Sequence, residues 1–506
     1  MMMFLRQGLP GYRVRTFALF ASALLLGACA LDRPTVDPDV TPPPEWRYTP
    51  AADPRQAEVD ARWWRRFGSE ELDALVARAE EGSLDLQAAV ARVGQAQALA
   101  RVAGAALVPE LEVGLDASRE RRLSGDVEVE GDFFTLGFRT RYELDFWGRN
   151  RALRDAAQAE FRASRFDLAT VCLTLTAGVA SSWLQVVGLR ERLSIAVLNL
   201  ENAEQVLATV ESRHRAGAAV PLELAQQQGL VAEQRREVEA LRSEVGDSEV
   251  ALATLLGIPV QRLSAQAGSL AGVDWPAIDA GLPAELLMRR PDLARAEARL
   301  EAANANIVAA RAALLPSIRL DAGLGFAGER GSQLLDSTLY NLTGAVLAPI
   351  FNGGRLRAQR DLAEAQQLEL LADYRRGIVA AFADVEISLN GIRGLDAQMA
   401  AQDERLRRAR EAFELAEARY RAGAETLLIL LDAQRTLYAA QDQQVRLRQA
   451  RLQASVALYK ALGGGWSPSW SVRDGHVAEQ VVAEFAEAAG DLGVRRESVG
   501  QVAQQP

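Results

Sequence analysis

The chain has 506 residues, of which 49% are hydrophobic and 25% are charged. This composition supports a buried core and excludes a disordered or collagen-like chain. A formal net charge of −10 leaves no basic surplus to neutralise phosphates, so no nucleic-acid partner is expected. With only two Cys and two His, neither a disulfide framework nor a Cys/His zinc cage can form, and no metal site is expected.

The N-terminus has the order of a secretory signal peptide. Basic residues come first, an apolar run follows over residues 17–26, and the segment ends in Leu26-Gly27-Ala28-Cys29. This order predicts a signal peptide over residues 1–28. A Cys directly after Leu-Gly-Ala resembles the bacterial lipobox, so Cys29 is expected to carry covalent lipid, and several acyl chains would anchor it firmly. Seven prolines between residues 31 and 54 predict that the segment 29–60 continues as an extended tether.

The sequence is internally duplicated. A shift of 206 to 207 residues aligns several unlike landmarks: Asp85 with Asp292, Pro109 with Pro316, Gly148-Arg149 with Gly354-Arg355, and His214-Arg215-Ala216-Gly217 with Tyr420-Arg421-Ala422-Gly423. We therefore predict two repeats, over residues 61–270 and 271–466, each built as a helix, two strands, a long helix, a turn and a helix. Residues 467–506 are expected to be disordered or to pack around the equator of the molecule.

Alternating apolar and polar residues predict four strands, near 110–118, 133–147, 317–327 and 338–350. In the second strand Phe134, Leu136 and Phe138 share one face, and polar residues share the other. This pattern is typical of a membrane barrel with a water-filled lumen, and a soluble half-buried sheet is the alternative. Because the smallest membrane barrels need about eight strands, several chains would have to share one barrel.

Long helices are expected between the strand pairs. There is no proline from Asn150 to Val220, and a continuous helix over the 68 residues 149–216 would be about 100 Å long. Gly217 and Gly423 occupy the position typical of a helix C′ glycine. The return helices are predicted to start at once, with Pro221 at the first helical position in one repeat and Thr426 as N-cap in the other. Each repeat therefore contains a long helical hairpin with a tight tip.

Three other motifs could indicate catalysis, cofactor binding or a membrane span. Residues 168–189 lack charges over a bilayer-spanning length, but their Ser, Thr and Gln side chains favour a helix packed among helices. The Gly323-Leu-Gly325-Phe-Ala-Gly328 match to a dinucleotide fingerprint lies in a predicted strand and precedes no helix. His214 suits a helix C-terminus better than catalysis. We expect no catalytic residues, no enzyme activity and no cofactor other than the lipid on Cys29.

Several longer stretches resemble one family. They are Leu282-Pro283, Leu287, Arg289-Arg290-Pro291-Asp292, Glu297, Ala303-Asn304-Ala305-Asn306, Ala310 and Pro316; Tyr142-Glu143-Leu144-Asp145; Leu255-Leu256-Gly257 with Pro259; Pro349 with Phe351-Asn352-Gly353-Gly354; and Tyr420-Arg421-Ala422-Gly423 with Leu431-Asp432-Ala433-Gln434. Together they resemble the outer-membrane factors of tripartite efflux systems, the TolC-like family, and specifically its NodT-type lipoprotein branch. The resemblance covers nearly the whole chain after the signal.

This resemblance implies a mixed α and β membrane protein: a homotrimer in which each chain gives four strands to a 12-stranded transmembrane β-barrel and its helices to a long periplasmic α-barrel. It also implies a passive exit duct for small molecules such as drugs. The partners would be a periplasmic adaptor, an inner-membrane RND pump and outer-membrane lipid. The expected location is the outer membrane, lipid-anchored and extending into the periplasm.

The resemblance also implies which residues act at the hairpin tips. Leu428 and Asp432 match the constricting positions of the family and are candidates for the aperture gate, with Leu222 and Gln226 as their counterparts in the first repeat. The adaptor would contact the tips through Arg215, Gly217, Tyr420, Arg421 and Gly423. Asp432 has an alternative interpretation as an ordinary solvated helix charge.

Two other functions stay open at this stage. A type I protein secretion duct shares the same architecture, so sequence does not separate it cleanly from a drug-efflux duct. A non-pore, coiled-coil structural lipoprotein would explain the helices but has no use for the alternating strands. The transported substrate, including the possibility of metals, is not encoded in an identifiable motif.

Overall fold

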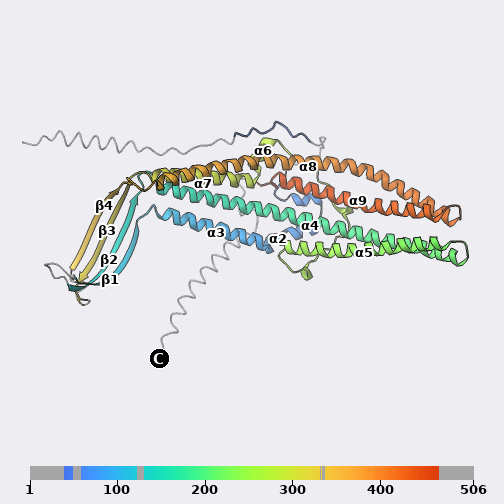
Figure 1. Ribbon diagram of the computed structural model, residues 1–506, viewed down its shortest axis with the longest axis horizontal. Helices are drawn as coiled ribbons and strands as arrows, with labels where there is room; N and C mark the ends of the chain where they lie inside the picture. Colours follow the sequence, from blue (N-terminus) through green and yellow to red (C-terminus); the bar gives the residue numbers. More distant parts are fainter. Residues whose placement is uncertain are drawn as a thin grey trace, which may run out of the picture. The chain divides into compact units, whose positions relative to one another are not determined.

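A computed structural model describes residues 39–48, 59–121, 130–330, 332, 335 and 337–466 (Figure 1). The signal peptide, Cys29 and the segment 467–506 lie outside the described residues. The chain forms two compact units. Among the described residues, the first unit takes 95–163 and 296–374, and the second takes 39–94, 164–295 and 375–466. Each unit thus combines segments from both sequence repeats.

The first unit contains an antiparallel sheet in the order β1-β2-β3-β4, formed by β1 (Glu110–Arg121), β2 (Glu130–Leu144), β3 (Ser317–Gly328) and β4 (Ser337–Leu347). The register places Phe138 opposite Val113 and Leu324, and Leu324 opposite Tyr340, so the apolar residues form continuous rows across all four strands. These side chains are largely exposed, with Val113 at 67% and Tyr340 at 85%. An apolar face this exposed needs a covering medium, as lipid would provide.

Two predicted strands end earlier than the alternation of their residues suggested. The strand expected to reach residue 147 ends at Leu144, because the Asp145 carboxylate instead accepts hydrogen bonds from the Asn150 and Arg151 backbone N–H groups, at 2.8 and 2.9 Å. The strand expected to reach residue 350 ends at Leu347, whose partner Ser317 is the first residue of β3. Pro316 and Pro349 lie just beyond this pair, and proline has no N–H to extend a ladder.

Small residues pack the helices of the first unit. Here α3 (Leu84–Ala105), α7 (Pro291–Ala312) and the first turns of α4 (Arg149–Arg215) and α8 (Arg355–Arg421) flank the sheet in sequence. Ala156 and Ala159 of α4 are buried in one cluster with Ala302 and Ala305 of α7. Alanine at these positions lets two helix backbones approach closely at no side-chain entropy cost.

The second unit holds both helical hairpins, α4 with α5 (Pro221–Leu255) and α8 with α9 (Leu427–Ala461), which Figure 1 shows as antiparallel pairs. The lengths of corresponding helices are the same: 67 residues in α4 and α8, and 35 in α5 and α9. Among the described residues, α4 is the helix long and apolar enough to be considered as a membrane span, and 56% of its apolar window is buried within the protein.

Aromatic residues consolidate the base of the second unit. The Trp63 ring of the short helix η1 (Trp63–Phe67) stacks on the Tyr459 ring of α9 with centroids 4.9 Å apart, and Phe67 is fully buried beside them. Helix α9 then stops, as predicted, at a triple glycine. Gly463 has a φ of +86°, and a Cβ there would collide with the Arg289 carbonyl oxygen.

Part of the predicted tether is packed rather than extended. Within residues 39–48, Trp46 is 5% exposed, and its Nε1 donates a 2.9 Å hydrogen bond to the Gly281 carbonyl. Its ring lies edge-on to Phe382 of α8, and the neighbouring Arg47 N–H donates to Glu386 Oε1 at 2.8 Å. Proline content suggested an extended segment because composition does not reveal that a single Trp has a binding site on a distant helix.

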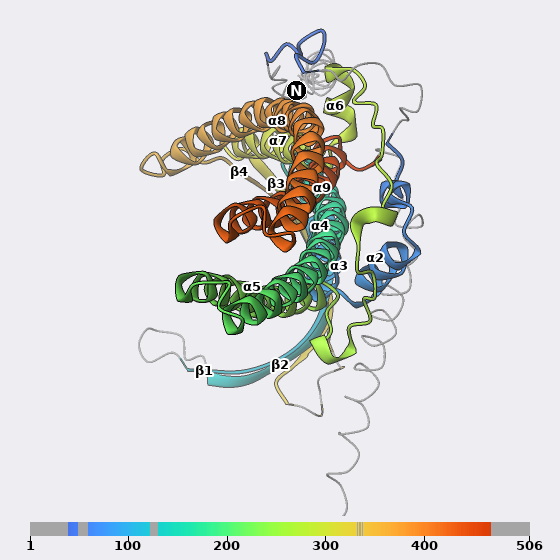
Figure 2. The same cartoon turned by 90° about the vertical axis from the view of Figure 1, so that its right-hand side faces the viewer.

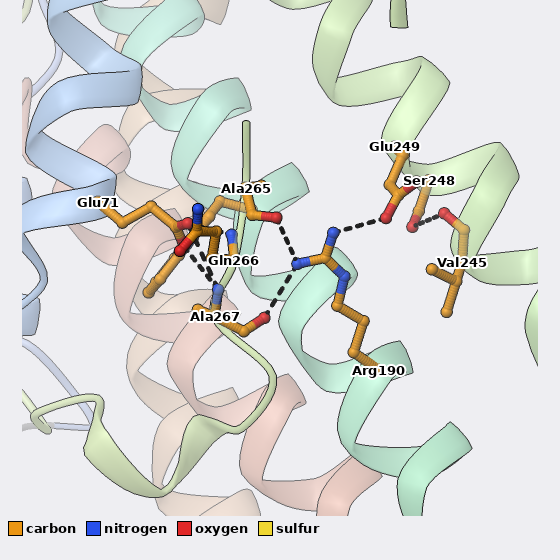
Figure 3. Close-up of polar contacts among 9 residues, drawn as sticks. Glu71, Arg190, Val245, Ser248, Glu249, Ala265, Gln266 and Ala267 are labelled. Carbon is orange, nitrogen blue, oxygen red and sulfur yellow. Dashed lines mark hydrogen bonds and ion pairs between the residues drawn. The ribbon is translucent and has the colours of Figure 1, made fainter. Parts of the chain in front are cut away.

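The connector between the repeats is held at two points (Figure 3). Glu71 of α2 (Glu70–Gly82) accepts hydrogen bonds from the Gln266 and Ala267 N–H groups and from Trp183 Nε1 of α4. Arg190 of α4 donates to the Ala265 carbonyl at 2.9 Å and pairs with Glu249 of α5 at 2.6 Å. Both charged groups thus satisfy backbone groups of a loop that has no regular structure of its own.

Candidate functional site

The two hairpin tips have the same backbone. At the end of α4 the Ala218 N–H donates to Arg213 O at 2.8 Å and the Gly217 N–H donates to His214 O at 3.0 Å. At the end of α8 the Ala424 and Gly423 N–H groups make the equivalent bonds to Arg419 O and Tyr420 O, again at 2.8 and 3.0 Å. This is the Schellman arrangement, which needs a left-handed C′ residue. The two glycines have φ values of +71° and +73°, as their predicted C′ positions require.

The return helices start where they were predicted to start, but one predicted cap is absent. Pro221 is the first residue of α5, and Thr426 precedes Leu427, the first residue of α9. Thr426 has the extended backbone of an N-cap, yet its side chain makes no capping hydrogen bond. Its counterpart Val220 has nearly the same backbone angles and cannot cap through its side chain, so the turn geometry forms without a side-chain cap.

Tyr420 is buried at 2% exposure, which corrects its assignment as an adaptor contact. Its ring lies in a cluster with Val206 and Val210 of α4 and Leu430 of α9. The Arg213 guanidinium lies 4.7 Å from the ring centroid, and Arg213 also donates a 2.8 Å hydrogen bond to the Tyr420 carbonyl. A partner protein cannot reach this ring. The residue instead joins the two hairpins to one another.

The other predicted contact residues are exposed at the tips. Arg215 reaches back to the Glu211 carbonyl at 3.4 Å, and Arg421 pairs with Glu417 one turn earlier at 2.8 Å. Open space surrounds Gly217 and Gly423, since a Cβ built on either would have no atom within 4 Å. Each tip therefore presents one arginine and one uncovered glycine turn.

The four candidate gate residues share one kind of position. Leu222 and Gln226 lie one turn apart on an exposed face of α5, and Leu428 and Asp432 lie one turn apart on an exposed face of α9. The leucines are 65% and 64% exposed, and Leu428 is so although it follows the buried Leu427. Asp432 makes no side-chain hydrogen bond or ion pair within the described part of the chain. Its carboxylate can therefore interact with ions or solutes at this face.

One residue on the same face was not identified from sequence. Arg435 is three residues beyond Asp432, is exposed, and makes no ion pair within the described residues. The helical spacing from Leu428 through Asp432 to Arg435 would have identified it. Its counterpart at a shift of 206 is Gly229. The second hairpin therefore carries an opposite pair of charges where the first carries an amide and no side chain.

Behind these exposed faces, each return helix contains a buried amide. Gln227 of α5 is fully buried and donates to the Ala203 carbonyl of α4 at 2.9 Å. Gln434 of α9 is also fully buried and donates to the Tyr438 hydroxyl at 3.3 Å. Burial raises the pKa of Tyr438 to about 12. Within the residues that the structure describes, no group of His, Cys, Asp or Glu is arranged to hold a metal ion.

Comparisons with known proteins agree with this geometry. A model of the family described as outer membrane efflux protein matches the chain twice, over residues 75–258 and 282–464. These two matches coincide with the two runs of corresponding helices and strands.

The alignments with individual relatives cover nearly the whole length of each relative. The pyoverdine export outer membrane protein OpmQ of Pseudomonas putida is 51% identical over 461 residues, covering 89% of this chain and 98% of the relative. The cation efflux system protein CusC of Escherichia coli O157:H7 is 32% identical, covering 88% and 98%. Among solved structures, the outer-membrane channel OprN aligns with a TM-score of 0.79 at 28% identity, covering 86% of this chain and 100% of that one.

Proposed function

Because the chain belongs to the outer membrane efflux protein family, we propose that its cargo is a siderophore of the pyoverdine type. The chain is an exit duct of an efflux system in the outer membrane, and it extends into the periplasm. The proposed cargo is supported by the difference in sequence identity between this chain and its relatives. The pyoverdine exporter is 51% identical, whereas the cation exporter is 32% identical over a similar length.

A complementation experiment tests the cargo. The chain would be expressed in Pseudomonas putida lacking its own OpmQ, and pyoverdine would be measured by fluorescence in the medium and in the periplasm. We expect extracellular pyoverdine to rise and periplasmic pyoverdine to fall relative to the empty vector. Restored resistance to toluene without restored pyoverdine export would contradict the siderophore assignment while leaving the exit duct intact.

We propose that three copies form one duct. Four strands per chain cannot close a membrane barrel, whereas three copies supply twelve, within the observed range for outer-membrane barrels. The exposed apolar face of the sheet would then meet lipid, which a coiled-coil spacer without a pore would not require. Planar-bilayer recording of the purified mature protein, with its mass in detergent, tests this. A monomer without channels would contradict the trimeric duct.

The exposed faces of α5 and α9 would form the aperture. In a trimer, three Leu428 side chains would make an apolar plug, and three Asp432 carboxylates would repel one another or hold a cation between them. Arg435, one helical turn beyond Asp432 on the same face, would limit the net charge of this ring. Gln226 gives the first hairpin no carboxylate, so the aperture charge would come from the second hairpin alone.

The exposed tips would dock a periplasmic adaptor that connects the duct to an inner-membrane RND pump. Arg215, Gly217, Arg421 and Gly423 remain candidates for this surface, because they are exposed in matching turns. Arg421→Glu should weaken co-purification of the cognate adaptor. Arg242→Glu is the control for a charge reversal away from the tips, since Arg242 is similarly exposed and pairs with Glu239 farther along α5. Equal adaptor binding by the wild type and Arg421→Glu would contradict docking at this tip.

We further propose that lipid on Cys29 anchors the N-terminus in the outer membrane. The lipobox-like sequence before Cys29 supports this. Metabolic labelling with a radioactive or clickable palmitate, comparing the wild type with Cys29→Ser, tests the modification directly. Label that persists in Cys29→Ser would show that the lipid lies elsewhere.

A further inference from the structure

The polar face of the sheet forms a wall of charged side chains. The register places Glu112 opposite Arg139, and it places Glu110, Arg141 and Asp321 in one row across three strands. Within residues 110–118, 133–143, 317–327 and 337–347, this polar face carries five carboxylates and three guanidinium groups, a net charge of −2. The carboxylates are Glu110, Glu112, Asp116, Glu143 and Asp321, and the guanidinium groups are Arg139, Arg141 and Arg319. The wall is therefore mixed in sign but negative in sum.

Most of the charged side chains on this wall take part in ion pairs. Arg139 pairs with Asp116 at 3.0 Å, and Arg141 pairs with Asp321 at 3.4 Å. Glu143 lies 3.5 Å from Arg149, at the start of α4. The side chains of Glu110 and Glu112 have no hydrogen bond or ion pair within the described residues, and both are exposed. These two carboxylates carry the negative sum of the wall.

A recess of about 230 Å³ opens beside these carboxylates. Its lining includes Glu110, Glu112, Arg139, Arg141 and Asn341. In the next row of the same face, three of the four strands carry glycine, with Gly114, Gly137 and Gly325 in register, and β4 carries Leu339. A Cβ on Gly137 would lie 3.0 Å from the Gly325 Cα, so larger residues are disfavoured there and these three strands place no side chain beside the recess in this row.

The opposite edge of the sheet cannot neutralise the pair. Glu110 and Glu112 lie on β1, which is one free edge, and β4 is the other. If the barrel closes by pairing β1 with β4 of the next copy, the residues brought beside the carboxylates come from Ser337–Leu347. That strand, STLYNLTGAVL, contains no acidic or basic residue. The two carboxylates therefore stay uncompensated by β4 in any register of closure.

We propose that this wall makes the barrel select for cations and for positively charged groups on the cargo, with Glu110 and Glu112 as the determining residues. The inference rests on the trimeric duct proposed above, in which three copies would place six such carboxylates around one lumen. A charged wall in a narrow lumen with low-dielectric surroundings focuses its potential on the permeating ion. The selecting row lies at the helix-proximal end of the strands, because Glu110 is the first residue of β1.

Reversal potentials in a KCl gradient test the proposal on the purified mature protein in planar bilayers. The wild type should pass K⁺ in preference to Cl⁻. In Glu110→Gln/Glu112→Gln, the K⁺/Cl⁻ permeability ratio should fall by about threefold, as expected for a change of roughly half a kT in lumen potential, which acts in opposite directions on the two ions. The difference should be clear near 0.1 M salt and nearly absent near 1 M, where the Debye length is only about 3 Å.

Two further variants separate this wall from other charges. Arg319→Gln removes an exposed cation on the same face that makes no ion pair within the described residues, so it should raise the ratio. Asp432→Asn reports any contribution of the aperture. If the wild type forms channels and neither Glu110→Gln/Glu112→Gln nor Arg319→Gln changes the K⁺/Cl⁻ permeability ratio, the selectivity of the wall is overturned while the duct itself stands. If the double variant formed no channels, the shift in Arg319→Gln would decide. A wild type without channels would contradict the duct on which the inference rests.

Discussion

The tips of the two hairpins share the backbone hydrogen bonds that end α4 and α8 but differ in what their side chains do. In the first tip, His214 is half-buried, and its Nδ1 lies 2.9 Å from the Ala219 carbonyl of its own turn. In the second tip, the equivalent Tyr420 is buried and is covered by Arg213 from the first. One side chain thus stabilises only its own turn, while the other joins two hairpins.

This difference shows how duplication can produce an asymmetric tip. The repeated backbone depends on local requirements, a left-handed glycine and an immediate helix start, which both copies retain. The side chains at matching positions are free to diverge, because the turn does not depend on them. In the second hairpin, Tyr420 packs against the first hairpin, and α9 carries the charged pair Asp432 and Arg435. We therefore expect substitutions in the second tip to have the larger effects.

Truncation of Tyr420 is expected to have the largest effect. Tyr420→Ala removes a buried aromatic ring from a cluster that includes Val210 and Leu430, and such truncations cost about 3–5 kcal/mol. Amide hydrogen exchange near residues 210–235 and 416–434 should accelerate in both hairpins. Tyr420→Phe is the matched control. Because the Tyr420 hydroxyl is buried without a hydrogen-bond partner, its removal should be neutral or slightly stabilising.

The first tip should tolerate the equivalent truncation. His214→Ala loses one hydrogen bond from a half-buried side chain, which corresponds to roughly 1 kcal/mol. Its effect on exchange should stay within the α4–α5 hairpin. Acceleration in the α8–α9 hairpin as well would mean that His214 also links the two hairpins, and the contrast between the tips would be lost.

Glycine substitutions should affect both tips equally. Gly217→Ala and Gly423→Ala each place a Cβ in a left-handed residue, which costs about 1–2 kcal/mol, and neither Cβ meets an atom within 4 Å. Thermal unfolding should therefore shift by the same amount in the two variants. Gly229→Ala is the control, since its added Cβ is also unobstructed but lies inside α5, where alanine is favoured. Unequal shifts at 217 and 423 would show that the tips differ in backbone strain as well as in side chains.

The features predicted from sequence are those with local causes. Gly217, Gly423 and Pro221 encode the turn within a few residues, so the tips and the helix bounds follow from them. The burial of Tyr420 depends on Arg213, which is 207 residues away in the chain, and no local pattern distinguishes a buried tyrosine from an exposed one. The end of β2 was predicted wrongly for a different reason, although its cause is local. Asp145 continues the strand alternation but is used by the backbone of α4 instead.

At the aperture, the two hairpins are expected to differ through one carboxylate. Asp432→Ala should raise single-channel conductance and the leak of large antibiotics, because a lock worth about 1 kcal/mol changes the open fraction about fivefold. Gln226→Ala should have little effect. Exchanging the two residues, Gln226→Asp with Asp432→Gln, tests whether the position matters as well as the charge. Conductance like that of the wild type in Asp432→Ala would leave the carboxylate as an ordinary solvated charge.

Near the tips, high pH should weaken the second hairpin before the first, whereas farther along α4 burial also raises the pKa of the Cys172 thiol to about 12. Burial raises the pKa of Tyr420 and raises that of Tyr438 to about 12, whereas their counterparts in the first hairpin, His214 and Ala232, contain no phenol. A buried neutral phenol contributes stability that is fully present below its unfolded pKa of about 10 and is lost as the pH rises through the folded pKa.

Between about pH 10 and 12, Tyr438 should therefore lower the unfolding free energy by up to about 1.4 kcal/mol per pH unit. Limited proteolysis across this range, read by cleavage site, would show whether cuts appear first in α8 and α9. Tyr438→Phe should delay those cuts without changing cleavage of α4 and α5. Simultaneous cleavage of both hairpins in the wild type and in Tyr438→Phe would assign the alkaline transition to charges that the two hairpins share, and the tyrosines would then contribute packing alone.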